Sequence, residues 1–163
     1  MDSFSIVLMA PQAGWAVWLW LGLVSLCTCC IIVTDVAWFW IPDEVVLVLV
    51  LANGVASLGG ITVLDPLVCL GVIVFFVVLF YLNPGGMGSG DVKLASALSL
   101  GCTAHSAFSM LFVAFILAAA AGSVAWLCQR RSVIPFGPFL LLGWWCSLFW
   151  GRTLAGTIFA VWL

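Results

Sequence analysis

Charged side chains are so scarce in this chain that they decide what it can fold into. Of 163 residues, 4 are Lys or Arg and 6 are Asp or Glu, while 66% are hydrophobic. A soluble domain carries about 25% charged residues, so these few charges cannot cover the surface of a water-soluble globule. The high apolar content also excludes a disordered chain, and four scattered cations form no basic stripe for nucleic acid. The sequence therefore predicts a protein of the lipid bilayer.

Uncharged stretches between the charges and the Pro/Gly clusters predict about six transmembrane helices of roughly 20 residues each. We expect these helices at Gly14–Thr34, Val45–Leu64, Pro66–Leu82, about Asp91–Cys102, about Ser106–Cys128 and Val133–Trp150. The last eleven residues, Thr153–Leu163, are too short to span and should extend the sixth helix or lie at the interface. The expected fold class is all-α and polytopic, with one membrane-embedded domain over residues 1–163.

The distribution of cations predicts the orientation of this domain. Six spans place segments 35–44 and 83–93 and the pair Arg130-Arg131 on one side of the membrane. Three of the four cations lie on that side, and Arg152 alone lies on the other. The positive-inside rule then places these loops in the cytoplasm and both termini outside. No Lys or Arg precedes the first apolar run, so we expect no cleavable signal peptide.

Two aspartates are expected at the same, cytoplasmic, membrane boundary. Asp35 closes the first predicted helix and Asp91 opens the fourth. Two carboxyl groups close together in a partly desolvated site share a proton. One can then deprotonate a water while the other protonates the attacked carbonyl, as in an aspartic protease. The alternative is that each aspartate merely sits in an interfacial loop in contact with water, and spacing alone leaves both interpretations open.

The residues before Asp91 favour the catalytic interpretation. In Gly88-Ser89-Gly90 no bulky side chain obstructs the backbone, and an extended peptide needs such access in order to be cut. A glycine-rich loop before a helix can also bind phosphate. However, the chain has no GxxxxGK[ST] motif, and an aspartate at the helix start would repel an anion.

Three motifs, in the right order, resemble those of the type IV prepilin peptidases, which are GxGD aspartic proteases of the bacterial inner membrane. Gly88-Ser89-Gly90-Asp91-Val92-Lys93-Leu94 resembles the GxGDxKL motif of that family. Asp35, followed seven residues later by Pro42, resembles its D-x6-P pattern, and the segment 134–140 (IPFGPFL) resembles its PFGPFL segment. Presenilin-type proteases are less similar, since the chain has no Tyr-Asp pair and no Pro-Ala-Leu. Lipoprotein signal peptidases have four spans and different motifs.

The resemblance implies a membrane aspartic endopeptidase that cuts the short basic leader from prepilins or pseudopilins at the cytoplasmic membrane face. It implies Asp35 and Asp91 as the catalytic pair. Two carboxyl groups and water suffice for this reaction, so we expect no metal and no organic cofactor. The expected partners are a prepilin or pseudopilin and the bilayer, without nucleic acid; the oligomeric state is not predicted. A different class of function is an inactive membrane scaffold or assembly factor of a pilus or secretion system, against which the intact aspartates argue.

The candidate substrate-binding residues are Gly88, Gly90, Asp43, Pro135, Gly137 and Pro138. Asp43 follows a proline, which is good helix-start chemistry; the alternative is a contact with a basic leader. Pro135, Gly137 and Pro138 interrupt helical hydrogen bonding where the sixth helix begins. This backbone either pairs with an extended substrate or is a simple helix entry, and the resemblance favours the first.

The chain also departs from the larger members of the family. Those members carry a cytoplasmic insert with paired cysteines and an N-methyltransferase activity, and this chain has no loop long enough to hold such an insert. It therefore resembles the short, peptidase-only members, and we do not expect it to methylate the product. The segment Val36–Trp40 is aromatic where basic residues are common in the family. Seven cysteines, an odd number with three of them inside the first predicted helix and four scattered elsewhere, predict neither a disulfide framework nor a metal site.

Overall fold

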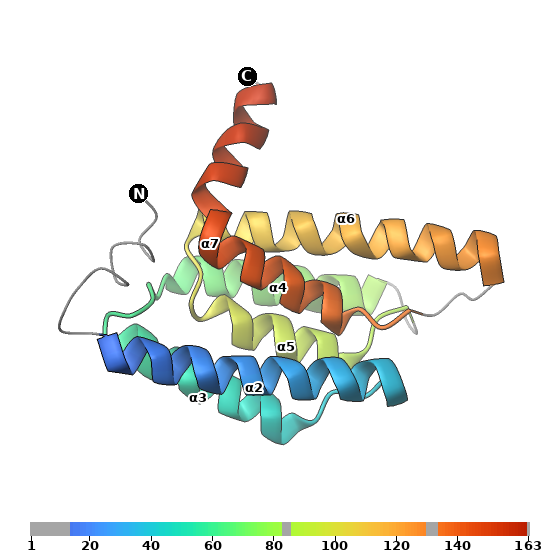
Figure 1. Ribbon diagram of the computed structural model, residues 1–163. Coiled ribbons are helices and arrows are strands. Elements are labelled where there is room, and N and C mark those ends of the chain that lie inside the picture. The colour runs from blue at the N-terminus through green and yellow to red at the C-terminus, as the bar shows by residue number, and fades with distance from the viewer. Residues whose placement is uncertain (1–13, 83–85, 130–133, 163) are drawn as a thin grey trace.

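The computed structural model describes residues 14–82, 86–129 and 134–162, and Figure 1 shows that they fold into helices. In chain order these are α2 (Gly14–Trp38), α3 (Asp43–Leu58), α4 (Pro66–Leu82), α5 (Ser89–Ser99), α6 (Ala104–Gln129) and α7 (Gly137–Trp162). Within these ranges the chain forms no β-strand. The predicted all-α fold class is therefore confirmed.

Each predicted helix has a counterpart in the structure, although several of the predicted boundaries differ from the observed ones. The third predicted helix is found unchanged as α4, but α3 ends at Leu58 instead of at Leu64. Two glycines stop it: the N–H of Gly59 donates to the Val55 carbonyl (2.8 Å), and Gly60 has φ +74°. Glycine adopts this left-handed conformation without steric cost. The prediction missed the double glycine as a stop signal and wrongly extended α3 to the next charged residue.

The last predicted helix is longer than expected. Its predicted start at Val133 lies outside the described residues, and α7 begins at Gly137 and continues to Trp162. Residues 153–162 therefore extend this helix, which is one of the two outcomes expected for them. Figure 1 shows that α7 changes direction along its length, so that its C-terminal part points away from the other helices.

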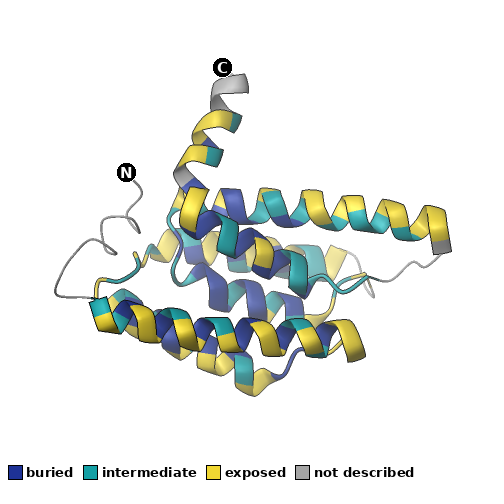
Figure 2. Ribbon diagram, viewed as in Figure 1, coloured by how far each residue is buried: buried dark blue, intermediate teal, exposed yellow. Residues whose placement is uncertain are grey.

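The short helix α5 lies inside the bundle, and its first residues carry most of the Gly88–Leu94 motif, including Asp91. It packs against α3, α4 and α7, while α2 and α3 lie side by side along one edge (Figure 1). Leu94, Ala95, Ala97 and Leu98 of α5 are fully buried. Figure 2 shows the same pattern, with buried residues turned inward and exposed residues along the outer faces of the longer helices. Residues at the start of α5 are thus held by a helix that has protein on several sides.

The C-terminal end of α5 is fixed by side chains from three other helices. The last carbonyl groups of a helix have no partner within the helix. Here Asn53 Nδ2 donates to Ala97 O (3.1 Å), Trp144 Nε1 to Leu98 O (3.1 Å), Cys69 Sγ to Ser99 O (3.2 Å) and Ser57 Oγ to Leu100 O (2.9 Å). These donors belong to α3, α7 and α4. They fix the position of α5 along its axis, and hence the position of its first turn.

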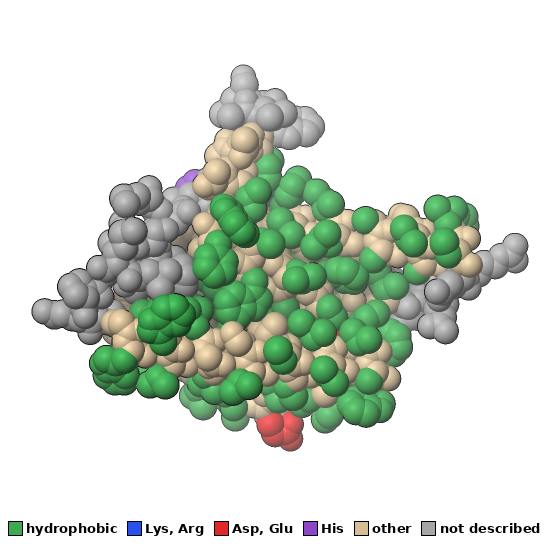
Figure 3. Space-filling view, in the orientation of Figure 1, with side chains coloured by type: hydrophobic (Ala, Val, Ile, Leu, Met, Phe, Trp, Pro, Cys, Tyr) green, Lys and Arg blue, Asp and Glu red, His purple; other side chains and the backbone are tan. Residues whose placement is uncertain are grey.

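The surface of the molecule is that of a membrane protein. Two helices, Gly14–Trp38 and the part of α6 from Ala104 to Cys128, are long and apolar enough to cross a membrane. Figure 3 shows hydrophobic side chains spread across the described part of the face in view, where acidic side chains are few. Helices α3, α4 and α5 have 16, 17 and 11 residues, fewer than the roughly 20 needed for a straight crossing. Six spans therefore stay a prediction, and the Arg130-Arg131 pair used for the orientation lies outside the described residues.

Candidate active site

Asp35 lies in the last turn of α2 and is 5% exposed. Its Oδ2 atom accepts a hydrogen bond from the backbone N–H of Gly137 at 3.0 Å. Gly137 is the first residue of α7, and the positive end of a helix dipole favours a carboxylate placed there. The start of α7 therefore both positions Asp35 and stabilises its ionised form.

Asp91 lies in the first turn of α5, outside the two candidate spans, and is 8% exposed. Its Oδ2 atom accepts a hydrogen bond from the Gly88 N–H (3.3 Å), and its own N–H donates to the Gly88 carbonyl (3.2 Å). Burial and, to a smaller extent, the nearby Asp35 carboxylate together raise the pKa of Asp91 to about 6, against the lowering effect of the Gly88 N–H. Asp91 therefore holds a proton more readily than an aspartate in water.

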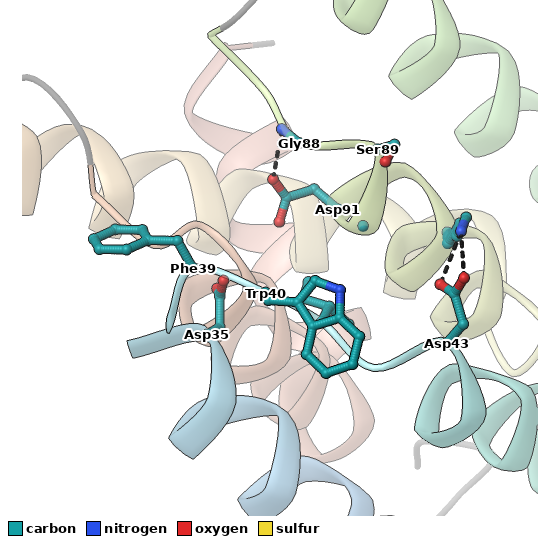
Figure 4. A pocket seen from close by; sticks show the side chains of 10 residues that line it. Asp35, Phe39, Trp40, Asp43, Gly88, Ser89 and Asp91 are labelled. Atoms are coloured by element: carbon teal, nitrogen blue, oxygen red, sulfur yellow. Dashed lines mark hydrogen bonds and ion pairs between the residues drawn. The ribbon is translucent and has the colours of Figure 1, made fainter. Parts of the chain in front are cut away.

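Both aspartates line one cavity of about 200 Å³. Figure 4 shows their carboxyl groups pointing into the space between the end of α2 and the start of α5, with Phe39 on one side and Trp40 on the other. The remaining lining residues are Ile41, Asp43, Gly88, Ser89, Gly90 and Lys93. The structure thus brings together two carboxyl groups that are 56 positions apart in the sequence, in a space large enough for water and part of a peptide.

The first turns of α3 and α5 are joined by an ion pair beside this cavity. Lys93 Nζ lies 2.8 Å from both carboxylate oxygens of Asp43 (Figure 4). Both side chains are more than half exposed, which makes the pair accessible to a substrate at the rim. The sequence analysis did not link these two residues. Only the fold brings them together, because 50 positions separate them.

The three candidate glycines differ in their surroundings. A methyl group on Gly88 would lie 3.5 Å from Asp91 Oδ2, which is an ordinary contact. A methyl group on Gly137 would lie 2.6 Å from Asp35 Oδ2, so no larger residue fits there without moving the carboxyl group. A methyl group on Gly90 would lie 3.2 Å from Ile41 Cβ. Gly88 and Gly90 line the cavity, whereas Gly137 holds the Asp35 carboxyl group through the hydrogen bond from its N–H.

Pro135 and Pro138 lie beside Gly137 at the start of α7, and both are partly buried. Neither proline is among the described residues that line the cavity. Phe136 packs its ring against Phe76 and Phe115, with centroids 6.3 and 5.4 Å away. This part of the third motif therefore anchors the start of α7 to α4 and α6, and through Gly137 it acts on Asp35.

The arrangement suits acid–base chemistry on a bound water. Two buried carboxyl groups around one cavity can hold a single proton between them, so that one accepts a proton while the other donates one. Among the described residues, no three His, Cys, Asp or Glu side chains come together to hold a metal ion. Sequence reasoning missed Ile41, Phe39, Trp40 and Lys93 as cavity residues. The sequence signal that could have identified these four residues is their position within or next to the motifs of the two aspartates.

Two comparisons show which known proteins the chain is similar to. Residues 13–123 match the type IV leader peptidase family; this range includes Asp35 and Asp91 and ends before Pro135. A curated relative, the prepilin leader peptidase/N-methyltransferase of Xanthomonas campestris pv. campestris, is 28% identical over 151 residues. The aligned part covers 83% of this chain and 52% of the relative, so the chain spans about half of that protein's length. No solved structure matches the chain significantly.

Proposed function

The chain belongs to the type IV leader peptidase family, and we propose that it is a membrane aspartic endopeptidase that removes the leader peptide of type IV prepilins or pseudopilins. The observation that carries the proposal is the cavity that contains the buried carboxyl groups of both Asp35 and Asp91. The domain acts in the bacterial inner membrane, with this cavity open to the cytoplasm. The wider activity of the longer relative is not carried over, because the aligned part covers 52% of that protein.

In the proposed reaction Asp35 is the base and Asp91 is the acid. The N–H of Gly137 at the start of α7 supports the ionised form of Asp35, and the raised pKa of Asp91 makes this side chain easier to protonate than an aspartate in water. Asp35 takes a proton from a water as the water oxygen bonds to the carbonyl carbon of the scissile peptide. Asp91 gives its proton to the carbonyl oxygen, which forms a tetrahedral diol. In the second step Asp91 recovers a proton from a hydroxyl group, the C–N bond breaks, and the amine leaves with the proton held by Asp35.

The substrate is proposed to enter along the Gly88–Gly90 backbone, which lines the cavity without bulky side chains. Asp43 lies at the rim and is proposed to attract a basic residue of the leader, in exchange with Lys93. For Pro135, Gly137 and Pro138 the contacts support a less direct role, since this segment anchors α7 and positions Asp35. Substrate contact at the two prolines stays a prediction.

We propose a peptidase without methyltransferase activity, because no described loop holds a further domain: the longest described connection between helices, residues 59–65, is short. The alternative is a scaffold that retains the fold without cleavage. Two buried carboxyl groups sharing one cavity argue against a scaffold, since such groups are costly to bury without a function.

Reconstitution tests this proposal. The purified chain is placed in lipid vesicles with a prepilin and S-adenosylmethionine, and the pilin product is read by mass spectrometry. We expect a pilin without its leader and with a free, unmethylated N-terminus; vesicles without the chain should leave the prepilin whole. An intact prepilin in the presence of correctly folded chain would favour the scaffold. A methylated product would show that the peptidase-only proposal is wrong.

A further inference from the structure

Ile41 lies in the connection between α2 and α3, where the backbone is constrained on both sides. Phe39 has φ +53°, and its N–H donates to the Asp35 carbonyl at 2.9 Å. Pro42 caps the start of α3 with φ −65°, a value that its ring fixes. Ile41 itself is β-branched, which restricts its χ1 angle, and it is 6% exposed. The direction of its side chain is therefore well defined.

The side chain of Ile41 fills the space in front of the first turns of both α5 and α7. A methyl group on Gly90 would lie 3.2 Å from Ile41 Cβ and 3.4 Å from its Cδ1. A methyl group on Gly137 would lie 3.3 Å from the same Cδ1 atom. Optimal contacts between carbon atoms are about 3.5–4.0 Å, so nothing larger than glycine fits at Gly90 unless Ile41 moves. At Gly137 the Asp35 carboxyl group would have to move as well.

Each of these glycines is directly connected to one of the two carboxyl groups. Gly90 precedes Asp91 in the chain, and the N–H of Gly137 holds Asp35 Oδ2 at 3.0 Å. Ile41 also lines the cavity that contains both aspartates. A shift of Ile41 would thus change the separation of the two carboxyl groups through both helices.

We propose that Ile41 is a positioning residue: its side chain sets the distance between the first turns of α5 and α7, and thereby the separation of Asp35 and Asp91. Its consequence for catalysis rests on the proposed function. On this account Gly90 is required because it leaves room for Ile41, whereas the sequence analysis attributed that requirement to substrate access. The two explanations predict different outcomes when one methyl group is moved.

The test moves that methyl group from one residue to the other. Gly90→Ala adds a carbon 3.2 Å from Ile41 Cβ and 3.4 Å from its Cδ1. Ile41→Val keeps Cβ but removes Cδ1, the atom that also packs at Gly137, so the shorter side chain can shift away from the new methyl group by the few tenths of an ångström that the Cβ contact requires. Displacement of catalytic groups by a fraction of an ångström lowers rates steeply, so we expect Gly90→Ala to lower kcat about tenfold with little change in KM. The double variant Ile41→Val/Gly90→Ala should recover kcat to within about threefold of wild type. Its kcat should also depend on pH in the same way as that of wild type. If Gly90 is needed for substrate access instead, the new methyl group blocks the substrate in both backgrounds, and the absence of recovery would overturn the proposal.

Two further glycines provide matched controls. At Gly137 the new methyl group would lie 2.6 Å from Asp35 Oδ2 as well as near Ile41, so Ile41→Val should fail to restore Gly137→Ala. In α4, a methyl group on Gly71 meets nothing within 4 Å, so Gly71→Ala should retain full activity. Recovery of Gly137→Ala by Ile41→Val would contradict the assignment of its clash to the Asp35 carboxyl group.

A measurement that needs no cleavage separates this proposal from the proposed function. Thermal unfolding midpoints are determined in detergent for wild type, both single variants and the double variant. We expect the double variant to be more stable than the sum of the single effects predicts, because residues in contact are coupled. If wild type cuts no prepilin, the proposed function fails while this coupling still tests the contact. Additive midpoints would overturn the role of Ile41 whatever the activity.

Discussion

The proton on Asp91 makes the stability of the protein depend on pH. Burial raises the pKa of this carboxyl group to about 6, from an unfolded value near 3.9. A raised pKa favours the folded state at low pH, and this stabilisation is lost as pH rises from the unfolded pKa through the folded one. Asp91→Asn mimics the protonated form, so it should unfold at a higher temperature than wild type at pH 8 and at the same temperature at pH 4. The difference at pH 8 should reach roughly 3 kcal/mol at most; thermal scans at both pH values measure it, and a variant that is less stable at pH 8 would contradict the assignment.

At the rim, Asp43 and Lys93 permit a matched comparison. Their side chains are 68% and 52% exposed, so breaking the pair should change the free energy of unfolding by under about 1 kcal/mol. Asp43→Asn removes the carboxylate, whereas Lys93→Met breaks the same ion pair and leaves the carboxylate in place. If Asp43 binds a basic leader residue, Asp43→Asn should raise KM about three- to tenfold without changing kcat, and Lys93→Met should not raise KM. If both variants raise KM equally, the loss of the ion pair explains the effect, and the proposed contact of Asp43 with the leader is contradicted.

At the scale of the helix, α5 is held in position by hydrogen bonds at its C-terminal end. Asn53 is fully buried; it accepts a hydrogen bond from Trp20 Nε1 (3.2 Å) and donates one to the Ala97 carbonyl at the end of α5 (3.1 Å). Asn53→Leu removes both bonds and should lower the free energy of unfolding by about 3 kcal/mol. Ser57→Ala, at a partly exposed donor to Leu100 O, should cost about 1 kcal/mol. Thermal unfolding of the two variants measures these costs, and a smaller effect for Asn53 than for Ser57 would contradict this description of the α5 end.

The helices themselves were largely predictable, because uncharged length and breaker residues act locally. The third predicted helix is found unchanged as α4, and α3 was predicted too long because Gly59-Gly60 was not counted as a stop. The two aspartates were selected correctly as neighbours, since both fall at helix ends on one side of the predicted bundle, and they line one cavity. Their catalytic role stays a proposal.

The contacts around the two aspartates were not predictable from the sequence. The Gly137 N–H reaches Asp35 across 102 positions, and Lys93 reaches Asp43 across 50. Such contacts depend on how α7 and α5 pack, and periodicity or motif spacing carries no signal for helix packing. The close approach of Ile41 to Gly90 was not predictable for the same reason, because Ile41 lies on another segment.

For the whole molecule, the account predicts that the two ends of α5 face opposite sides of the membrane. Ser89 is exposed at the start of α5, and His105 is exposed in the first turn of α6, which follows the other end of α5. In a background without cysteine, Ser89→Cys should react with a membrane-impermeant maleimide only in inside-out vesicles, and His105→Cys only in intact cells. The positive-inside argument requires this result. Labelling of both residues from one side would show that the predicted topology is wrong.

The central claim is that Asp35 and Asp91 together cut a peptide bond. The most direct test is to express wild type, Asp35→Asn and Asp91→Asn with a prepilin in cells that lack their own peptidase, and to read the size of the pilin. Asparagine keeps the shape of each side chain and can still accept the hydrogen bonds from Gly137 and Gly88. Both variants should therefore insert and fold. The account predicts that wild type yields mature pilin and that neither variant does, whereas mature pilin from either variant at a rate near wild type would contradict it.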